Sequence, residues 1–516
     1  MNSNTNVMNQ QEIVRYEWKN IPWPKLEKDI FKLQKRIYQA EKCKNINKVH
    51  KLQRLLLNSI SAKLLAVRKV TQDNKGKKTA GIDGKANLNQ KERLQLAYSL
   101  NIREKAKPTR RVWIPKPDKT GKRPLGIPTI TDRVKETLMK MALEPELEAK
   151  FEPNTYGFRL GRTCHDAIEA IFNALNRKTA YVLDADISAC FDNINQETLL
   201  GKLNTTPTFK KIIKGWLKAG IMENRKFKST ETGTIQGGAI SPLLACIALH
   251  GLESHIKETL ADELFQYLKK KNGKATHKTA QHNISIIPYA DDFVIIHESK
   301  EIILKAKILV EKWLKTIGLE LNKSKTRITH TFNGEKSGFD FLGFSIRHYA
   351  TKNNKKGYKL LIKPSKNSIK QQSIKLKHRL KSKLGATQAE VIKELNPIIR
   401  GWSQYFSSAV SKATFSLLDS LMYKKLWKWA VFRHPKKGKI WVKKKYFKTL
   451  GNDNWRFMTN NTAYLIWHSE HVIKRHIKVQ GTKSPYDGDW VYWGNRLKKS
   501  ARKTKNNNKF IEVTTK

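Results

Sequence analysis

Two adjacent aspartates, Asp291 and Asp292, interrupt two apolar, β-branched runs within residues 284–298. Isoleucine and valine pack well on a pleated sheet, so the runs predict a β-hairpin whose polar break consists of Ala290 and the two aspartates. Neighbouring carboxylates repel each other unless a cation lies between them, which favours a divalent-metal site. A solvated turn is the alternative, because aspartate is common in turns.

A second acidic segment, residues 181–193, lies earlier in the chain and supplies the further carboxylate that such a site needs. Its apolar residues predict a strand, and the period of two places Asp184 and Asp186 on one face. In a two-metal site a few carboxylates hold two ions roughly 3.5 to 4 Å apart, which activate the attacking oxygen and stabilise the leaving oxygen. We therefore predict Asp186, Asp291 and Asp292 as catalytic residues and metal ligands.

Further motifs accompany these acids along the chain. They are RPLGIPT at 123–129, YGFR at 156–159, QGG at 236–238, YADD at 289–292, LN at 321–322 and FDFLGF at 339–344. In this order they resemble the successive blocks of a reverse transcriptase. Two later motifs, LNPIIRGW at 395–402 and SPYDGDW at 484–490, resemble the maturase and following regions of group II intron-encoded proteins.

The resemblance implies an α+β fold, a right-hand polymerase with a reverse transcriptase core of fingers and palm, followed by a helical thumb/maturase domain. It implies an RNA-directed DNA polymerase in which a primer 3′-OH attacks a dNTP, with two Mg²⁺ ions, or alternatively Mn²⁺, on the three aspartates. It also implies binding of the parent group II intron RNA, assistance to splicing, and mobility by target-primed reverse transcription. The partners expected are therefore intron RNA, RNA template, DNA primer or target DNA, and dNTPs.

Three cationic side chains are candidates for the charged part of the nucleotide. By the resemblance Arg123 contacts the triphosphate, and Lys116 is a second candidate for that role. Cationic contacts offset the charge that develops on the leaving pyrophosphate. Lys325 follows as a residue that neutralises phosphate or donates a proton, although a lysine in a basic loop is usually a solvated charge.

Three other residues are candidates for the sugar and the base. Phe191 falls where the family has the aromatic ring that blocks a ribose 2′-hydroxyl, so we expect a preference for deoxynucleotides. An aromatic after a strand is otherwise an ordinary core residue. Gln236 and Gly237 are expected to line the dNTP and template pocket, because glycine permits close backbone approach.

The balance of 101 Lys plus Arg against 44 Asp plus Glu leaves a net charge of +57. Such a charge attracts polyanions, and nucleic acid is favoured over a membrane because basic residues are interleaved with aromatics and no apolar run approaches 18 residues. The oligomeric state is not indicated. Candidate RNA-binding residues are Arg110, Arg111, Arg400, Trp402 and Tyr405.

Composition and motifs together predict five segments. They are a basic helical extension at 1–85, fingers and palm at 86–350, thumb/maturase helices at 351–440, a basic RNA/DNA-binding region at 441–497, and a basic, disordered tail at 498–516. The four cysteines lack metal-binding spacing, and no secretion signal is visible, so we expect a bacterial cytoplasmic protein or one synthesised inside an organelle. We also expect the form of the family without an HNH endonuclease domain, because no cysteine follows Cys246.

Two other functions stay open at this point. One is a splicing-only maturase without polymerase activity, which the intact aspartates and Gln236 oppose. The other is a reverse transcriptase outside introns, for example in phage defence, which the maturase-like motif opposes.

Overall fold

The computed structural model describes residues 17–115, 121–224, 226–352, 355–460 and 463–505, with side chains described as far as residue 497. The chain forms two compact units, and their division passes through strands β3 (Tyr181–Asp186) and β8 (Arg327–His330). The first unit comprises Met1–Thr163, Leu183–Arg327 and Val479–Asn495, and the second comprises Cys164–Val182, Ile328–Lys478 and Arg496–Lys516. Helices and sheets occur together, which confirms the α+β class.

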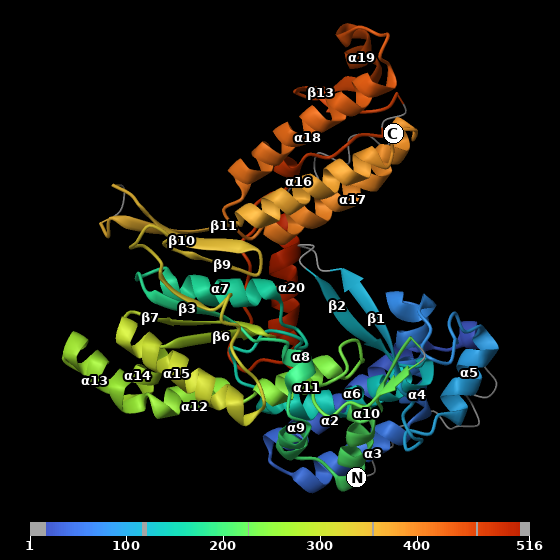
Figure 1. Cartoon of the computed structure of the whole chain (residues 1–516), viewed down its shortest axis with the longest axis vertical. Coiled ribbons are helices and arrows are strands. Elements are labelled where there is room, and N and C mark those ends of the chain that lie inside the picture. The colour runs from blue at the N-terminus through green and yellow to red at the C-terminus, as the bar shows by residue number, and fades with distance from the viewer. Residues whose placement is uncertain (1–16, 116–120, 225, 353–354, 461–462, 506–516) are drawn as a thin grey trace. The chain divides into compact units, whose positions relative to one another are not determined.

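The first unit begins with helices, as predicted for residues 24–70. They are η1 (Trp18–Asn20), α2 (Trp23–Lys42), α3 (Ile46–Asn58), α4 (Ile60–Arg68), η2 (Lys69–Asp73), η3 (Lys75–Lys78), α5 (Gln90–Ser99) and α6 (Ile130–Lys150). Apolar residues three and four positions apart give α2 a buried face of Leu26, Ile30, Leu33 and Ile37. This face packs within a group formed by α2, α3, α4 and α6 (Figure 1).

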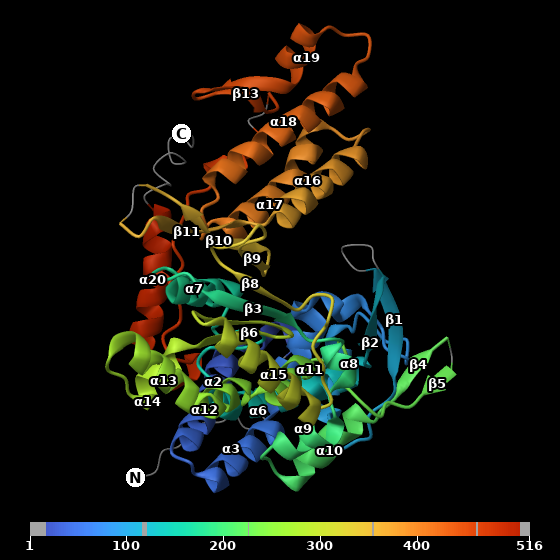
Figure 2. The same ribbon diagram turned by 60° about the vertical axis from the view of Figure 1, so that its left-hand side comes forward.

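Two hairpins form one sheet of the first unit. Strands β1 (Thr109–Pro115) and β2 (Lys122–Ile127) pair antiparallel, and β4 (Ile221–Glu223) pairs with β5 (Lys226–Lys228). The strand order is β2-β1-β4-β5, with β1 parallel to β4. Figure 2 shows the two hairpins side by side, in agreement with the pairing of β1 with β4.

Helices make up most of the rest of this unit. They are α8 (Cys190–Asn193), α9 (Gln196–Lys202), α10 (Pro207–Leu217), α11 (Ser241–Leu249), α12 (Leu252–Thr259), α13 (Ala261–Asn272), α14 (His277–Asn283) and α15 (Lys300–Thr316). Helix α11 is apolar on nearly all sides and is buried, while α15 packs on β7. A fully apolar helix is stable only inside a core, so α11 fixes the QGG segment that precedes it.

The acidic hairpin belongs to a sheet of order β6-β7-β3-β8. Strands β6 (Ser285–Tyr289) and β7 (Asp292–His297) pair antiparallel, as predicted. The turn differs in detail from the prediction, because Asp292 already pairs with Tyr289 and only Ala290 and Asp291 form the turn. Ala290 has a φ of 60° there, so this tight turn is conformationally demanding for a residue with a side chain.

A C-terminal strap, Val479–Asn495, returns to the N-terminal helices of the first unit. It contains η5 (Pro485–Asp487) and the start of α20 (Trp490–Lys505). Tyr486 is buried, its ring centroid lies 5.6 Å from that of Phe31, and its hydroxyl donates to Glu144 over 3.3 Å. Arg162 donates to the carbonyl of Gly481 over 2.8 Å. The SPYDGDW motif therefore provides packing for the first unit.

The second unit contains α7 (Cys164–Leu175), a three-stranded sheet and a helical bundle. The strands β9 (Phe339–Phe341), β10 (Phe344–Ala350) and β11 (Tyr358–Pro364) have the order β11-β10-β9. The bundle consists of α16 (Lys366–Lys381), α17 (Gln388–Phe406), α18 (Lys412–Arg433), α19 (Lys439–Tyr446), β12 (Phe447–Leu450), β13 (Asp453–Phe457) and η4 (His468–Glu470). The FDFLGF motif forms β9 and the start of β10, and the thumb/maturase helices predicted within residues 351–440 correspond to α16, α17 and α18.

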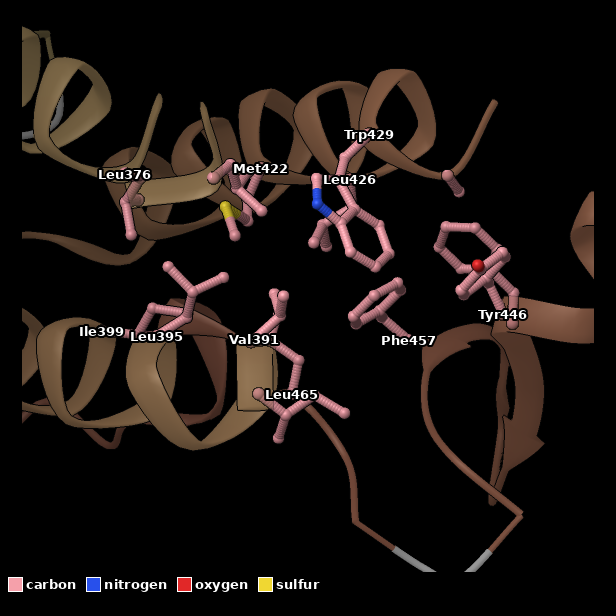
Figure 3. Close-up of a cluster of buried hydrophobic side chains, with 14 of the residues drawn as sticks. Leu376, Val391, Leu395, Ile399, Met422, Leu426, Trp429, Tyr446, Phe457 and Leu465 are labelled. Atoms are coloured by element: carbon pink, nitrogen blue, oxygen red, sulfur yellow. The ribbon is translucent and has the colours of Figure 1, made fainter. Parts of the chain in front are cut away.

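One apolar core holds the bundle together. Leu376 of α16, Leu395 of α17, and Leu426 and Trp429 of α18 point toward one another, and Phe457 of β13 joins them (Figure 3). The indole N–H of Trp429 donates to the carbonyl of Lys383 over 2.9 Å, so the buried ring leaves no free donor. The bundle is thus a packed element rather than a set of isolated basic helices.

Two further observations concern the C-terminal residues of the chain and helices that could span a membrane. Helix α20 continues through residues 498–505, where the sequence predicted the start of a disordered tail; lysine, arginine and alanine there are favourable helix formers. Residues 506–516 lie outside the described part. Within the described residues, no helix is both long and apolar enough to cross a membrane.

Candidate active site

The three predicted aspartates come together where β3 ends and the β6–β7 hairpin turns. Asp186 is the last residue of β3, and the backbone N–H of the following Ile187 donates to the carbonyl of Asp291 over 3.0 Å. Asp186 and Asp292 lie close enough for the carboxyl group of Asp186 to raise the pKa of Asp292. Sheet pairing therefore brings together acids that are far apart in sequence, as predicted.

Crowding changes the acidity of this group. Burial, followed by the charges of Asp291 and Asp186, raises the pKa of Asp292 to about 7. Burial and the charge of Asp186 also raise the pKa of Asp291. Desolvated carboxylates that repel one another attract cations, so the site is suited to a positively charged ligand.

One cation is already present in the form of Lys325. Its Nζ donates to Oδ2 of Asp186 over 2.9 Å, and this hydrogen bond raises the pKa of the lysine. The predicted residue thus contacts the carboxylates, although its side chain is 63% exposed. Asn322 supports the segment, because its N–H donates to the carbonyl of Asp186 over 2.8 Å. Within the described residues, no group of three or more His, Cys, Asp or Glu side chains is arranged to hold a metal ion.

The YGFR turn lies directly against the acidic hairpin. The N–H of Tyr156 donates to the carbonyl of Pro288 over 3.1 Å. A Cβ atom on Gly157 would lie 2.4 Å from the backbone nitrogen of Ala290, so only glycine fits this approach. The ring of Phe158 lies edge-on to Phe191, with centroids 6.1 Å apart at 76°. Phe191 is half-buried, and Phe158 orients its ring beside the aspartates.

The predicted pocket residues Gln236 and Gly237 lie beside β2. The carbonyl of Gln236 accepts from the N–H of Gly126 over 2.8 Å. Gly237 has a φ of +123°, and a Cβ there would lie 2.5 Å from the carbonyl oxygen of Gly126. On the other side, the carboxylate of Glu136 accepts from backbone N–H groups that follow the glycines. Sequence reasoning missed Glu136, since a glutamate inside a helix carries no local signal.

A cavity of about 370 Å³ opens between the two hairpins and this turn. Arg111, Trp113, Asp192, Thr234 and Gln236 are among its lining residues. The indole N–H of Trp113 donates to Glu223 over 2.6 Å at this wall. The cavity combines a cation, an aromatic ring and hydroxyl groups, which is a combination that recognises nucleotides.

The cationic candidates differ in their surroundings. Arg123 is exposed on β2, and its charge lowers the pKa of Asp291, so it acts on the carboxylates across space. Arg110 donates to the carbonyl of Ala80 over 3.0 Å and is partly engaged in holding the N-terminal loop. Lys116 lies outside the described residues.

The three candidates for RNA binding in the second unit are divided by burial. Arg400 is exposed on α17. Trp402 instead packs on Phe406, with centroids 4.5 Å apart, and the Tyr405 hydroxyl donates to the carbonyl of Leu342 over 3.0 Å. Trp402 and Tyr405 therefore have structural contacts, and their contact with RNA stays a prediction.

Comparison with known families covers most of the chain in three matches. The family described as reverse transcriptase (RNA-dependent DNA polymerase) matches residues 114–346. The N-terminal domain of reverse transcriptase matches residues 18–100, and the maturase-specific domain of group II introns matches residues 369–447.

Individual relatives agree with these matches. Protein YkfC of Escherichia coli is 30% identical over 326 residues, which cover 57% of this chain and 83% of the relative. Maturase-like protein 1 of Euglena gracilis is 28% identical over 423 residues, or 79% of each chain. The group II intron-encoded protein LtrA of Lactococcus lactis subsp. cremoris is 34% identical over 288 residues, 46% of this chain and 47% of the relative. The matched region thus spans about half the length of some of these relatives. The chain belongs to the family of group II intron reverse transcriptases and maturases.

Proposed function

We propose that the protein is an RNA-directed DNA polymerase that also binds its parent group II intron RNA and assists splicing and mobility. The observation that carries the proposal is the convergence of Asp186, Asp291 and Asp292 with Lys325 at the end of β3. In the right-hand description, β1 and β2 belong to the fingers, the β6-β7-β3-β8 sheet to the palm and α16 to α18 to the thumb. The protein would act in the compartment where its intron is transcribed, the bacterial cytoplasm or an organelle.

The residue types at this site are those that Mg²⁺ prefers, although the described side chains are not arranged around an ion in this structure. Three carboxylates supply the oxygen ligands that hard divalent cations prefer, and the raised pKa of Asp292 reflects a repulsion that a cation would relieve. Asp186, Asp291 and Asp292 would hold the ions. When bound, two Mg²⁺ ions supply activation of the primer hydroxyl and stabilisation of the leaving oxygen.

The protein's own side chains would then orient the nucleotide and neutralise part of its negative charge. Arg123 binds the triphosphate and offsets negative charge on the leaving pyrophosphate. Phe191, oriented by Phe158, lies beneath the sugar and excludes a 2′-hydroxyl. Lys325 exchanges its contact with Asp186 for the pyrophosphate, to which its ammonium donates a proton as the bond to the α-phosphorus breaks.

The cavity of about 370 Å³ beside Gln236 is the proposed path of the unpaired template strand. It adjoins the nucleotide pocket because Gln236 lines it and because Asp192, another lining residue, directly follows Phe191. Arg111 supplies a cation for phosphate, and the half-exposed Trp113 supplies a ring for stacking.

The maturase role rests on the match of residues 369–447 to the group II intron maturase-specific domain. The protein would bind the folded intron RNA more tightly than unfolded RNA and so stabilise the splicing-competent fold by linkage. The RNA itself would carry out the cutting and joining steps.

The test is primer extension on an RNA template with dNTPs and Mg²⁺, together with intron RNA binding, for the wild type and Asp291→Asn. Asp262→Asn, an exposed aspartate of α13, is the matched control. We expect extension by the wild type and the control, loss of extension in Asp291→Asn, and intron RNA binding by all three. Binding without extension in the wild type would leave a splicing-only maturase. Extension without preference for intron RNA would leave a reverse transcriptase with another role.

A further inference from the structure

A buried glutamate lies behind the turn that carries Gln236 and Gly237. Glu136 of α6 is 1% exposed. Its Oε2 accepts hydrogen bonds from the backbone N–H groups of Ala239, at close range, and Ile240, at 3.4 Å. These two residues directly precede α11, so the carboxylate meets the turn at the start of a buried helix.

The carboxylate of Glu136 supplies a hydrogen-bond acceptor that the residues next to α11 do not supply. Ile240, the residue before α11, provides no side-chain hydrogen bond to the first turn of the helix. The N–H groups from which Glu136 accepts belong to Ala239 and Ile240, which lie just before the helix, so the carboxylate stabilises the turn that leads into the positive end of α11. Burial raises the pKa of Glu136 to about 7 although the two amides oppose the change. Asp132 and Arg133, both of α6, are the charged side chains that act on it.

The opposite side of the same turn is held by β2. The N–H of Gly126 donates to the carbonyl of Gln236 over 2.8 Å. Gly126 and Glu136 belong to one continuous segment, in which β2 leads through Thr129 into α6. Thr129 fixes this junction, because its hydroxyl accepts from the N–H of Asp132 over 3.1 Å and donates to the Asp132 carboxylate over 2.7 Å.

We propose that Glu136 is a positioning residue that, with Gly126, clamps the main chain of Gln236 and Gly237 in the nucleotide-binding geometry. The inference rests on the proposed polymerase function. Gly126 and Glu136, which hold the turn from its two sides, belong to the segment that also carries Arg123 on β2. The position of the proposed triphosphate contact is therefore fixed relative to the glycine turn. Displacement of the turn would misalign the nucleotide without removing any group that touches it.

The test compares variants of Glu136 with one variant of a half-buried glutamate on the same helix. Glu136→Leu removes the acceptor at similar volume, Glu136→Asp draws the carboxylate back, and Glu136→Gln keeps an acceptor oxygen in place. Glu144→Leu is the matched control, since Glu144 is a half-buried glutamate of α6 that bonds to Tyr486 of the strap. Single-nucleotide incorporation gives kcat and the KM for dNTP, and hydrogen exchange of residues 234–242 reports the turn directly.

We expect Glu136→Leu and Glu136→Asp to raise the KM for dNTP by about tenfold or more, with a smaller fall in kcat, while Glu136→Gln restores values near wild type. Exchange in residues 234–242 should rise in Glu136→Leu and stay at the wild-type rate in Glu144→Leu. If the KM for dNTP and the exchange of residues 234–242 were unchanged in Glu136→Leu and Glu136→Asp, the proposal would be wrong.

Two outcomes separate this inference from the proposed function. If Glu136→Leu does not fold, the comparison of Glu136→Asp with Glu136→Gln decides, since only the first withdraws the acceptor. If the wild type extends no primer, the polymerase proposal falls, and hydrogen exchange by itself tests whether Glu136 holds the turn.

Discussion

At the scale of single residues, the candidate site depends on side chains whose orientation is set by a neighbour. Phe191 is half-buried, and its ring lies edge-on to Phe158 at 76°. Edge-to-face pairing favours one ring orientation, so Phe158 helps to fix the ring of Phe191, the proposed steric filter. Asp186 orients Lys325 by a different contact, a hydrogen bond that its carboxylate accepts from the lysine ammonium.

Replacement of Phe191 by valine should weaken discrimination against ribonucleotides, because the ring that excludes the 2′-hydroxyl is gone. We expect the kcat/KM for a ribonucleotide, relative to the deoxynucleotide, to rise by about tenfold or more. Steady-state incorporation of matched nucleotide pairs measures the ratio. Phe227→Val, at an exposed ring of β5, is the control and should leave the ratio unchanged. An unchanged ratio in Phe191→Val would assign the ring to packing alone.

Glu136 makes stability depend on pH. Its pKa is raised from 4.5 to about 7, so the folded protein keeps a proton that the unfolded chain releases between these values. The stabilisation is complete below pH 4.5 and is lost as the pH rises through 7. At about 1.4 kcal/mol for each tenfold change in proton affinity, the wild type should lose about 3 kcal/mol across this range relative to Glu136→Gln. Urea denaturation of both proteins at pH 5 and pH 8 measures the difference. Urea midpoints that change equally with pH in the wild type and in Glu136→Gln would contradict the prediction.

At the scale of elements, the site is built where a hairpin meets a turn and a strand end. The β6–β7 turn contacts Gly157 on one side, and its Asp291 carbonyl accepts from Ile187 after β3 on the other. The strap contacts the chain just after the YGFR segment, because Arg162 donates a hydrogen bond to the carbonyl of Gly481. Acidic hairpin, YGFR turn and strap therefore form one packed series within the first unit.

A methyl group at Gly157 should disturb this series. The added Cβ of Gly157→Ala would lie 2.4 Å from the nitrogen of Ala290, so the hairpin or the turn must shift. We expect primer extension to fall by about a hundredfold, the effect of misplacing reacting groups by about 1 Å. Gly201→Ala is the matched control, because Gly201 lies in α9 with nothing near the added Cβ. Equal activity of the two variants would show that the close contact does not position the aspartates.

At the scale of the whole molecule, net charge is expected to dominate the proposed interaction with nucleic acid. Residues 351–516 carry 39 Lys plus Arg and 8 Asp plus Glu, so much of the net charge of +57 lies in the C-terminal third. Phosphate contacts release counterions, which makes affinity depend steeply on salt. Specificity for intron RNA must come from other contacts, since charge alone does not distinguish RNAs.

Intron RNA binding should therefore weaken by about a thousandfold or more between 50 and 200 mM salt, as for proteins that make 6 to 10 phosphate contacts. Titration by filter binding at several salt concentrations gives the slope. Asp291→Asn should have the same slope as the wild type, because the aspartates contribute to catalysis and not to phosphate binding. A nearly flat dependence would mean that stacking and shape, rather than phosphate neutralisation, supply most of the affinity.

The sequence by itself determined the features that depend on neighbours along the chain. Periodicity placed the helices of residues 24–70 and the acidic hairpin, and composition indicated a nucleic-acid partner. The order of motifs indicated the family. These properties are readable because helix and strand periods, turn preferences and net charge are local or additive.

Only the tertiary structure decided which distant residues meet. Lys325 lies 139 positions from Asp186, and Glu136 lies 103 positions from Ala239, so no local spacing relates them. The structure likewise shows that Tyr486 of SPYDGDW packs on Phe31 and Tyr38 of α2, a contact that the sequence of the motif does not indicate. Such contacts arise from the packing of complete elements, and the geometry of the candidate site depends on them.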